Sequence, residues 1–132
     1  MKPKTISTLF LIAGLFNILG VLIFSKVFTN EVLMNTQPDV MGYFGLLSII
    51  LWGLAYIAVH KTYASVPWLV GVFFLEKALY VTVYLRWMND HSILEIYDQD
   101  VLAGIFYSIY GVNDLLTGLF FGFVFFKILK RP

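Results

Sequence analysis

The chain has 132 residues, of which 60% are hydrophobic and 18% aromatic, and its formal net charge is only +1. Just 13% of the residues are charged, against a usual share of about 25%, so the composition indicates an integral membrane protein with the lipid bilayer as its partner and no nucleic acid. Cysteine does not occur, which excludes disulfides, thiolate metal sites and iron–sulfur clusters.

Long apolar runs separated by short polar segments fill the chain and leave no room for a soluble domain. They predict an all-α fold, an integral membrane four-helix bundle that forms a single transmembrane domain over residues 1–132. We expect the helices at about residues 5–28, 42–60, 67–88 and 101–129.

The first run follows the cationic segment MKPK. It is longer than the apolar region of a secretory signal, about 7 to 15 residues, and lacks a small-x-small cleavage pattern, so it is expected to stay as a membrane helix. Gly14, Asn17 and Gly20 follow one another at a spacing of three. This spacing predicts a face on which a neighbouring helix can approach and the Asn17 amide can find a partner.

The second helix follows a polar connection over residues 29–41, in which a short interfacial turn is expected at residues 32–34. In the helix itself Gly45, Ser48, Trp52 and Ala55 recur at helical spacing, with Tyr56 beside them. This face is small at one end and aromatic at the other, and we interpret it as a packing face.

The third helix, PWLVGVFFLEKALYVTVYLRWM, begins with Pro67, a residue suited to a first helical turn. Trp68 and Trp87 are expected at opposite membrane interfaces, as in an aromatic belt. Glu76 and Lys77 fall at the middle, where each charge costs about 3 kcal/mol to insert. They are therefore expected to be used or neutralised inside the protein.

The fourth helix follows a second polar connection at residues 89–100 and carries a stripe of glycines. Gly104, Gly111 and Gly118 are seven residues apart, and Gly118 with Gly122 makes a GxxxG step. The stripe predicts a groove in which another helix approaches the backbone closely.

The charge distribution predicts the orientation. With four spans, both termini share a side with Lys61, and six of the nine cations fall there. By the positive-inside rule the termini are expected in the cytoplasm and the protein in the inner (plasma) membrane as a multi-pass protein. His60 and His91 fall on opposite sides, so a haem held by both histidines of one subunit is not expected. No other cofactor is expected. Asp98 and Asp100 lack EF-hand spacing, so we interpret them as solvated loop residues rather than a metal site.

Polar residues from three of the helices fall at one depth near mid-membrane, and they are the candidate ligand-binding or proton-linked residues: Asn17, Glu76, Lys77, Tyr80, Asn113 and Asp114. Adjacent helical residues point about 100° apart, so we expect Lys77 to pair with Asp114 and Glu76 to bond to Tyr80, Asn17 or Asn113. Two acids then face one base, which favours a proton- or cation-linked site. The alternative is a polar layer that only fixes helix register.

The segments FGLLSIILWGLAY, LEKALY and GVNDLLTGLFFG resemble small four-helix bacterial membrane proteins of the DoxX-like and BphX-like kind. Such families are mostly of unknown function, and some members are associated with membrane oxidoreductase complexes. The resemblance therefore implies little chemistry, and it assigns no site residue here.

Two functions stay open. The first is a small-molecule, proton or cation site that works as a proton-coupled carrier or binder, for which a homodimer is expected with the glycine stripe as one candidate contact. The second is a non-catalytic accessory or assembly subunit of a larger membrane complex of the oxidoreductase type. An enzyme ranks third, because no catalytic residues such as a serine–histidine pair are indicated.

Overall fold

A computed structural model describes residues 1–131, and every regular element in that part of the chain is a helix. The elements are α1 (Pro3–Phe24), α2 (Glu31–Thr36), α3 (Pro38–Met41), α4 (Tyr43–Val59), the 3-10 turn η1 (Tyr63–Ser65), α5 (Pro67–Met88), α6 (Ile93–Gln99) and α7 (Val101–Leu129). The predicted all-α class is thus confirmed. By length and composition α1, α5 and α7 can each cross a membrane, whereas α4 is shorter, with 17 residues.

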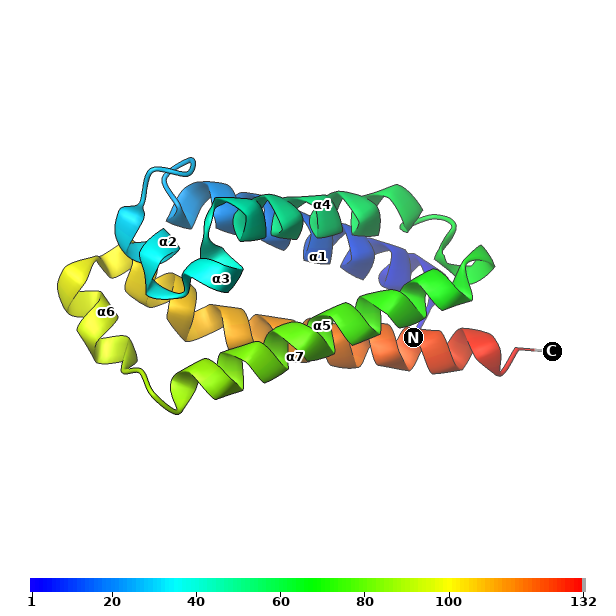
Figure 1. Cartoon of the computed structure of the whole chain (residues 1–132). Helices are drawn as coiled ribbons and strands as arrows, with labels where there is room; N and C mark the ends of the chain where they lie inside the picture. Colours follow the sequence, from blue (N-terminus) through cyan, green and yellow to red (C-terminus); the bar gives the residue numbers. More distant parts are fainter. Residues whose placement is uncertain (132) are drawn as a thin grey trace.

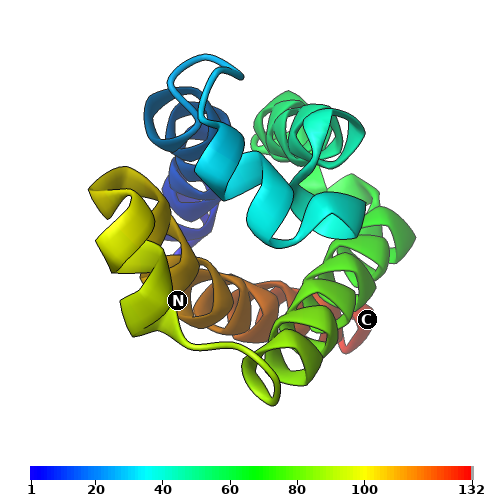
Figure 2. The same ribbon diagram turned by 60° about the vertical axis from the view of Figure 1, so that its left-hand side comes forward.

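The four long helices form two antiparallel pairs: α1 packs along α4, and α5 packs along α7 (Figure 1). The pairs meet through α1 and α7, while the backbones of α4 and α5 approach each other at few points and these helices touch through side chains such as Tyr56 and Phe73. Both chain ends lie at one end of the molecule, here called the terminal end, where the Lys127 ammonium donates to the Met1 carbonyl at 2.6 Å. Helices α2, α3 and α6 lie across the opposite end, the loop end (Figure 2).

Glycines set the close approach within the pair formed by α1 and α4. A Cβ atom on Gly14 would meet the Gly53 carbonyl oxygen at 2.5 Å, and one on Gly53 would meet the Gly14 carbonyl at 2.7 Å. Backbone therefore packs on backbone, as small residues allow in membrane helices. This confirms the expected role of Gly14 as a point of close helix approach.

The glycine stripe of α7 is filled by side chains of the same chain. Tyr97 of α6 lies over Gly104, and Tyr84 of α5 lies over Gly111. The Lys77 stem and the Phe74 ring of α5 lie over Gly118 and Gly122 in turn. The predicted close-packing groove is present, but α5 and α6 occupy it, so the stripe is not open as the homodimer contact that the sequence suggested.

Helix α1 ends at Phe24 rather than at residue 28, because the chain turns sharply there. Lys26, Val27 and Phe28 all have positive φ, at 50°, 55° and 63°, a left-handed conformation that L-residues adopt at a cost. The buried Ser25 supports this turn by accepting a hydrogen bond from the Phe28 N–H at 3.0 Å.

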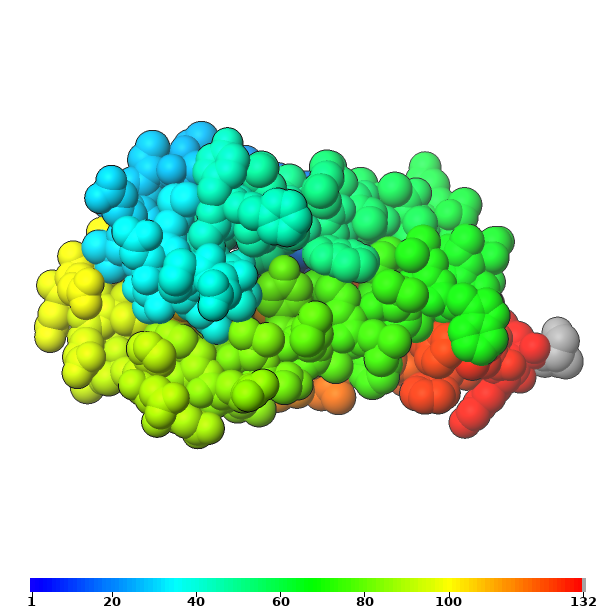
Figure 3. Space-filling view, viewed as in Figure 1, coloured from blue at the N-terminus to red at the C-terminus, as the bar shows by residue number. Residues whose placement is uncertain are grey.

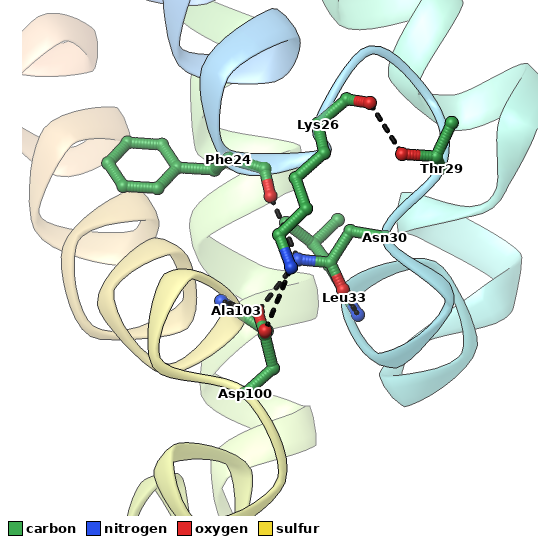
Figure 4. A network of polar contacts seen from close by, with 7 residues as sticks. All are labelled: Phe24, Lys26, Thr29, Asn30, Leu33, Asp100 and Ala103. Atoms are coloured by element: carbon green, nitrogen blue, oxygen red, sulfur yellow. Dashed lines mark hydrogen bonds and ion pairs between the residues drawn. The ribbon is translucent and has the colours of Figure 1, made fainter.

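The polar connections are more ordered than the sequence predicted. The turn expected at residues 32–34 lies inside α2, and the second connection contains α6. Asp100 joins these segments: its carboxylate accepts from the Asn30 amide at 2.8 Å, from the Ala103 N–H at 2.9 Å and from Lys26 at 3.2 Å (Figure 4). It therefore ties the end of α1 and the start of α2 to the start of α7.

Two apolar clusters fill the interior on either side of the molecular centre. The terminal-end cluster is built around Phe10, Phe73 and Phe121, and the loop-end cluster includes Trp87, Tyr107 and Leu33. Trp68 is 72% exposed, as an interfacial residue would be, but Trp87 is only 6% exposed. The prediction that Trp87 belongs to an aromatic belt is therefore wrong: its ring packs on Tyr84, Tyr107 and His91.

Candidate functional site

Buried polar side chains from all four long helices meet between the two apolar clusters. We call this group the polar layer, and it consists of Asn17 of α1, Tyr56 of α4, Glu76 and Lys77 of α5, and Asp114 of α7. Each of the five is less than 9% exposed. The residues lie where the two helix pairs face each other, so their hydrogen bonds also join the pairs.

Lys77 is the centre of the polar layer. Its ammonium lies 2.7 Å from the Asp114 carboxylate and donates to the Asn17 side-chain oxygen at 3.3 Å. The Asn17 amide in turn donates to the Ile49 carbonyl of α4 at 3.0 Å. The predicted pairing of Lys77 with Asp114 is confirmed, and so is the expectation that the Asn17 amide finds a partner.

Glu76 has a different partner from those predicted. The Tyr56 hydroxyl of α4 donates to its Oε2 atom, while Oε1 lies 3.9 Å from the Lys77 ammonium. The bond expected from Tyr80, Asn17 or Asn113 is not the one formed, because Glu76 points toward α4 rather than along its own helix. Tyr56 is therefore a site residue that the sequence placed only on a packing face. The one signal in the sequence was its position four residues after Trp52, which places both side chains on the same face of the helix.

Tyr80 and Asn113 line a small cavity beside the polar layer rather than completing its hydrogen bonds. The cavity, of about 50 Å³, also touches four of the five polar-layer residues, Asn17, Glu76, Lys77 and Asp114. One water needs about 10 to 15 Å³ of such space, so a few waters or a small ion fit there. A drug-sized ligand, which fills about 300 to 1,000 Å³, does not. All six residues predicted for the site thus lie around one cavity.

The charges of the polar layer do not balance when all three groups are ionised. Glu76 and Asp114 supply two carboxylates, and Lys77 supplies the one ammonium that lies beside them. Lys77 is nearer to Asp114, at 2.7 Å, than to Glu76, at 3.9 Å. A buried negative charge without a partner is costly, so the arrangement favours a proton on one carboxylate or a cation near Glu76.

The histidines and the loop carboxylates lie away from this site. His60 is bonded to Ser7 at the terminal end at 2.9 Å, and His91 bonds to the Trp87 carbonyl at 2.8 Å at the loop end. Asp100 is engaged by the loop-end segments, while Asp98 is exposed. Among residues 1–131 no group of three or more potential metal-binding side chains is found.

No family model, curated protein or solved structure matches the chain. The DoxX-like and BphX-like resemblance therefore stays a prediction, and the function has to be argued from the residues of the polar layer.

Proposed function

We propose that this chain is a four-span protein of the inner (plasma) membrane whose polar layer is a proton- or small-cation-linked site. In this proposal α4 is the fourth span. The protein works as a carrier or binder, and its binding step is coupled to the gain or loss of a proton or cation at Glu76. The observation that carries it is the placement of two carboxylates and one ammonium, all buried, around a cavity of about 50 Å³. Ionisable groups are expensive inside a membrane and are usually functional there.

Glu76 is the exchangeable group in this proposal. It faces Tyr56 from α4, Lys77 and Tyr80 from its own helix, and Asp114 from α7, while α1 presents only the uncharged Asn17. Asp114 and Asn17 hold the Lys77 ammonium, so Glu76 is the carboxylate that a proton or a small cation can neutralise. The cavity has room for the ion and a few waters beside it.

The experiment that tests this function compares the wild type with Glu76→Gln in purified form. Gln keeps the shape and hydrogen-bonding capacity of Glu but cannot titrate. We expect the wild-type unfolding midpoint to depend on pH, and the variant to lose part of that dependence. Glu95→Gln is the control, because Glu95 is exposed on α6. Both variants keep His60 and His91, so any histidine contribution cancels. Identical pH profiles for wild type and Glu76→Gln would overturn the proposal.

The accessory-subunit alternative has one observation in its favour. The bonds from Tyr56 to Glu76 and from Lys77 to Asn17 join the two helix pairs, as expected of a layer that fixes helix register. A purely structural layer should tolerate Glu76→Gln, because the Tyr56 hydroxyl can still donate to the amide oxygen. The pH profile therefore separates the two functions.

The proposed orientation has its own test, because the natural chain contains no cysteine. Cysteines introduced at Lys4 and Arg131 should resist an impermeant thiol reagent in intact cells, while one at Asp98 should be labelled. Labelling at Lys4 would place the termini outside and overturn the orientation.

A further inference from the structure

A lateral groove runs between α4 and α5, the two long helices whose backbones approach each other at few points. Gly45, Ser48 and Trp52 line it from α4, and Glu76 and Tyr80 line it from α5. The groove has a volume of about 460 Å³ and is visible as the hollow between these helices in the middle of Figure 3. The α4 face that the sequence suggested as a packing face does pack in part, since Gly45 lies against the Val40 backbone and Trp52 against Phe73. The same face also forms one wall of the groove.

The groove reaches from the loop end to the polar layer. Asp39 and Val40 of α3 lie at its loop end, whereas Glu76 and Tyr80 belong to both the groove and the small central cavity. The walls between these points are largely apolar, with Leu75 and Leu79 among their residues. A molecule in the groove would thus lie against apolar side chains and still reach the Glu76 carboxylate.

The charged side chains of the groove are all acidic. Asp39 and Glu76 line it, and no lysine or arginine does. Lys77, the nearest buried cation to Glu76, is held by Asp114 and does not line the groove. Trp52, Phe44 and Tyr80 add aromatic rings, whose faces attract cations. Both features disfavour an anionic ligand and favour a cationic one.

We propose that the groove between α4 and α5 binds a lipophilic organic cation, a protonated amine or quaternary ammonium with an apolar body. The apolar body lies along Trp52, Leu75 and Leu79, and the cationic head approaches Glu76, with Asp39 attracting the cation at the loop end. This inference rests on the proposed function, since it uses Glu76 as the group that gives up a proton when a cation binds beside it, here from the groove. The proton leaves to water when the cation binds.

A volume of about 460 Å³ falls within the range of about 300 to 1,000 Å³ that is usual for small-molecule sites. A lipid acyl chain could fill the apolar part of the groove, but it carries no positive charge to interact with Glu76 and Asp39, the acidic side chains that line it. The charge of the groove therefore distinguishes the proposed ligand from lipid.

The test uses tetraphenylphosphonium and tetraphenylborate, which share size and shape but have opposite charge. Binding of each to the full chain in lipid nanodiscs is measured by equilibrium dialysis, with empty nanodiscs as the blank for partitioning into lipid. We expect saturable binding of tetraphenylphosphonium that weakens as pH falls, and no saturable binding of tetraphenylborate. Glu76→Gln should weaken tetraphenylphosphonium binding by about tenfold or more.

Filling the groove provides a second test that leaves the carboxylates intact. Ser48→Trp or Leu79→Trp should abolish tetraphenylphosphonium binding, while Leu119→Trp, at a 60% exposed position of α7 outside the groove, should not. Two different groove variants are used so that misfolding of one does not decide the result. Equal binding of the two probes, or binding unaffected by both groove variants, would overturn the inference and indicate lipid-like occupancy.

The result also separates this inference from the proposed function. If tetraphenylphosphonium does not bind while Glu76→Gln still alters the pH profile of unfolding, the groove inference fails and the proton-linked site stands. If the probe binds in the groove but Glu76→Gln changes neither its affinity nor the pH profile, the exchange at Glu76 and the proposed function both fail.

Discussion

Tyr56 of α4 donates a hydrogen bond to Glu76 of α5, and this bond joins two helices whose backbones approach each other at few points. The Tyr56 ring is fully buried, and its centroid lies 4.8 Å from the ring centroid of Phe73 and 4.8 Å from that of Phe121. Aromatic packing in the terminal-end cluster therefore fixes the position of the Tyr56 hydroxyl, which donates the hydrogen bond to Glu76. The apolar core and the polar layer are thus coupled through one side chain.

Replacing Tyr56 by Phe should remove this bond while keeping the ring. Hydrogen bonds to charged groups contribute about 1.5 to 3 kcal/mol, and we expect a loss of that size in the free energy of unfolding when Glu76 is ionised. Tyr43→Phe is the control, since Tyr43 is 59% exposed. Chemical unfolding in detergent measures both variants. An equal, small effect of the two changes would show that the bond from Tyr56 contributes nothing.

The pair formed by Lys77 and Asp114 allows a double-mutant cycle. Lys77→Met strands a buried carboxylate, which should cost about 3 to 5 kcal/mol. Adding Asp114→Asn removes the stranded charge, so the double variant should recover much of the loss. The readout is again the free energy of unfolding. Strictly additive effects would mean that the 2.7 Å ion pair contributes no coupling.

The long elements, and the meeting of the polar residues midway along them, followed from simple sequence patterns. Apolar runs bounded by Pro67 and by the acids before Val101 gave the bounds of α5 and α7 as the structure has them. The partner of Lys77 was predictable because a buried ammonium needs a carboxylate, and Asp114 was the one carboxylate on another helix at that depth.

The remaining features depend on side-chain direction and on which helices touch. The polar layer gained Tyr56 because α4 presents it to α5, and no spacing within a single helix indicates that contact. Trp87 was assigned to the membrane interface by its position in the apolar run. Its ring is instead buried in the loop-end cluster together with Ile96 of α6 and Leu33 of α2, and the sequence did not predict these two short helices. The groove between α4 and α5 likewise arises from helix pairing, which the sequence left open.

The glycines offer a matched pair of substitutions. A Cβ on Gly111 would overlap the Tyr84 ring, whereas one on Gly20 would meet nothing within 4 Å. Gly111→Ala should therefore destabilise the protein by about 1 to 3 kcal/mol through overpacking. Gly20→Ala should stabilise it by up to about 1 kcal/mol through helix propensity.

The larger change Gly111→Leu should separate α7 from α5, while Phe123→Leu, at a position 48% exposed, should matter less. Thermal unfolding midpoints compare all four variants. If the changes at Gly111 and Phe123 had equal effects, the close packing of Tyr84 on α7 would not be needed for stability.

Asp100 provides a prediction for the loop end that is separate from the polar layer. The Ala103 N–H, the Asn30 amide and the Lys26 ammonium all favour its ionised form, and together they lower the pKa of the Asp100 carboxyl. Since the folded pKa lies below the unfolded value of about 3.9, the stabilisation is fully present above that value. It is lost as the pH falls through the folded pKa.

Asp100→Ala removes the N-cap of α7 together with the links to α1 and α2 (Figure 4). At pH 7 we expect it to cost about 1 to 2 kcal/mol, and at about pH 3 and below the difference from wild type should shrink as the wild-type carboxyl takes up a proton. Asp98→Ala is the control, because Asp98 is exposed and a surface change should stay within about 0.5 kcal/mol. Unfolding at pH 7 and at successively lower pH measures the difference. A difference that stays constant into acid would show that the charge of Asp100 does not hold the loop end together.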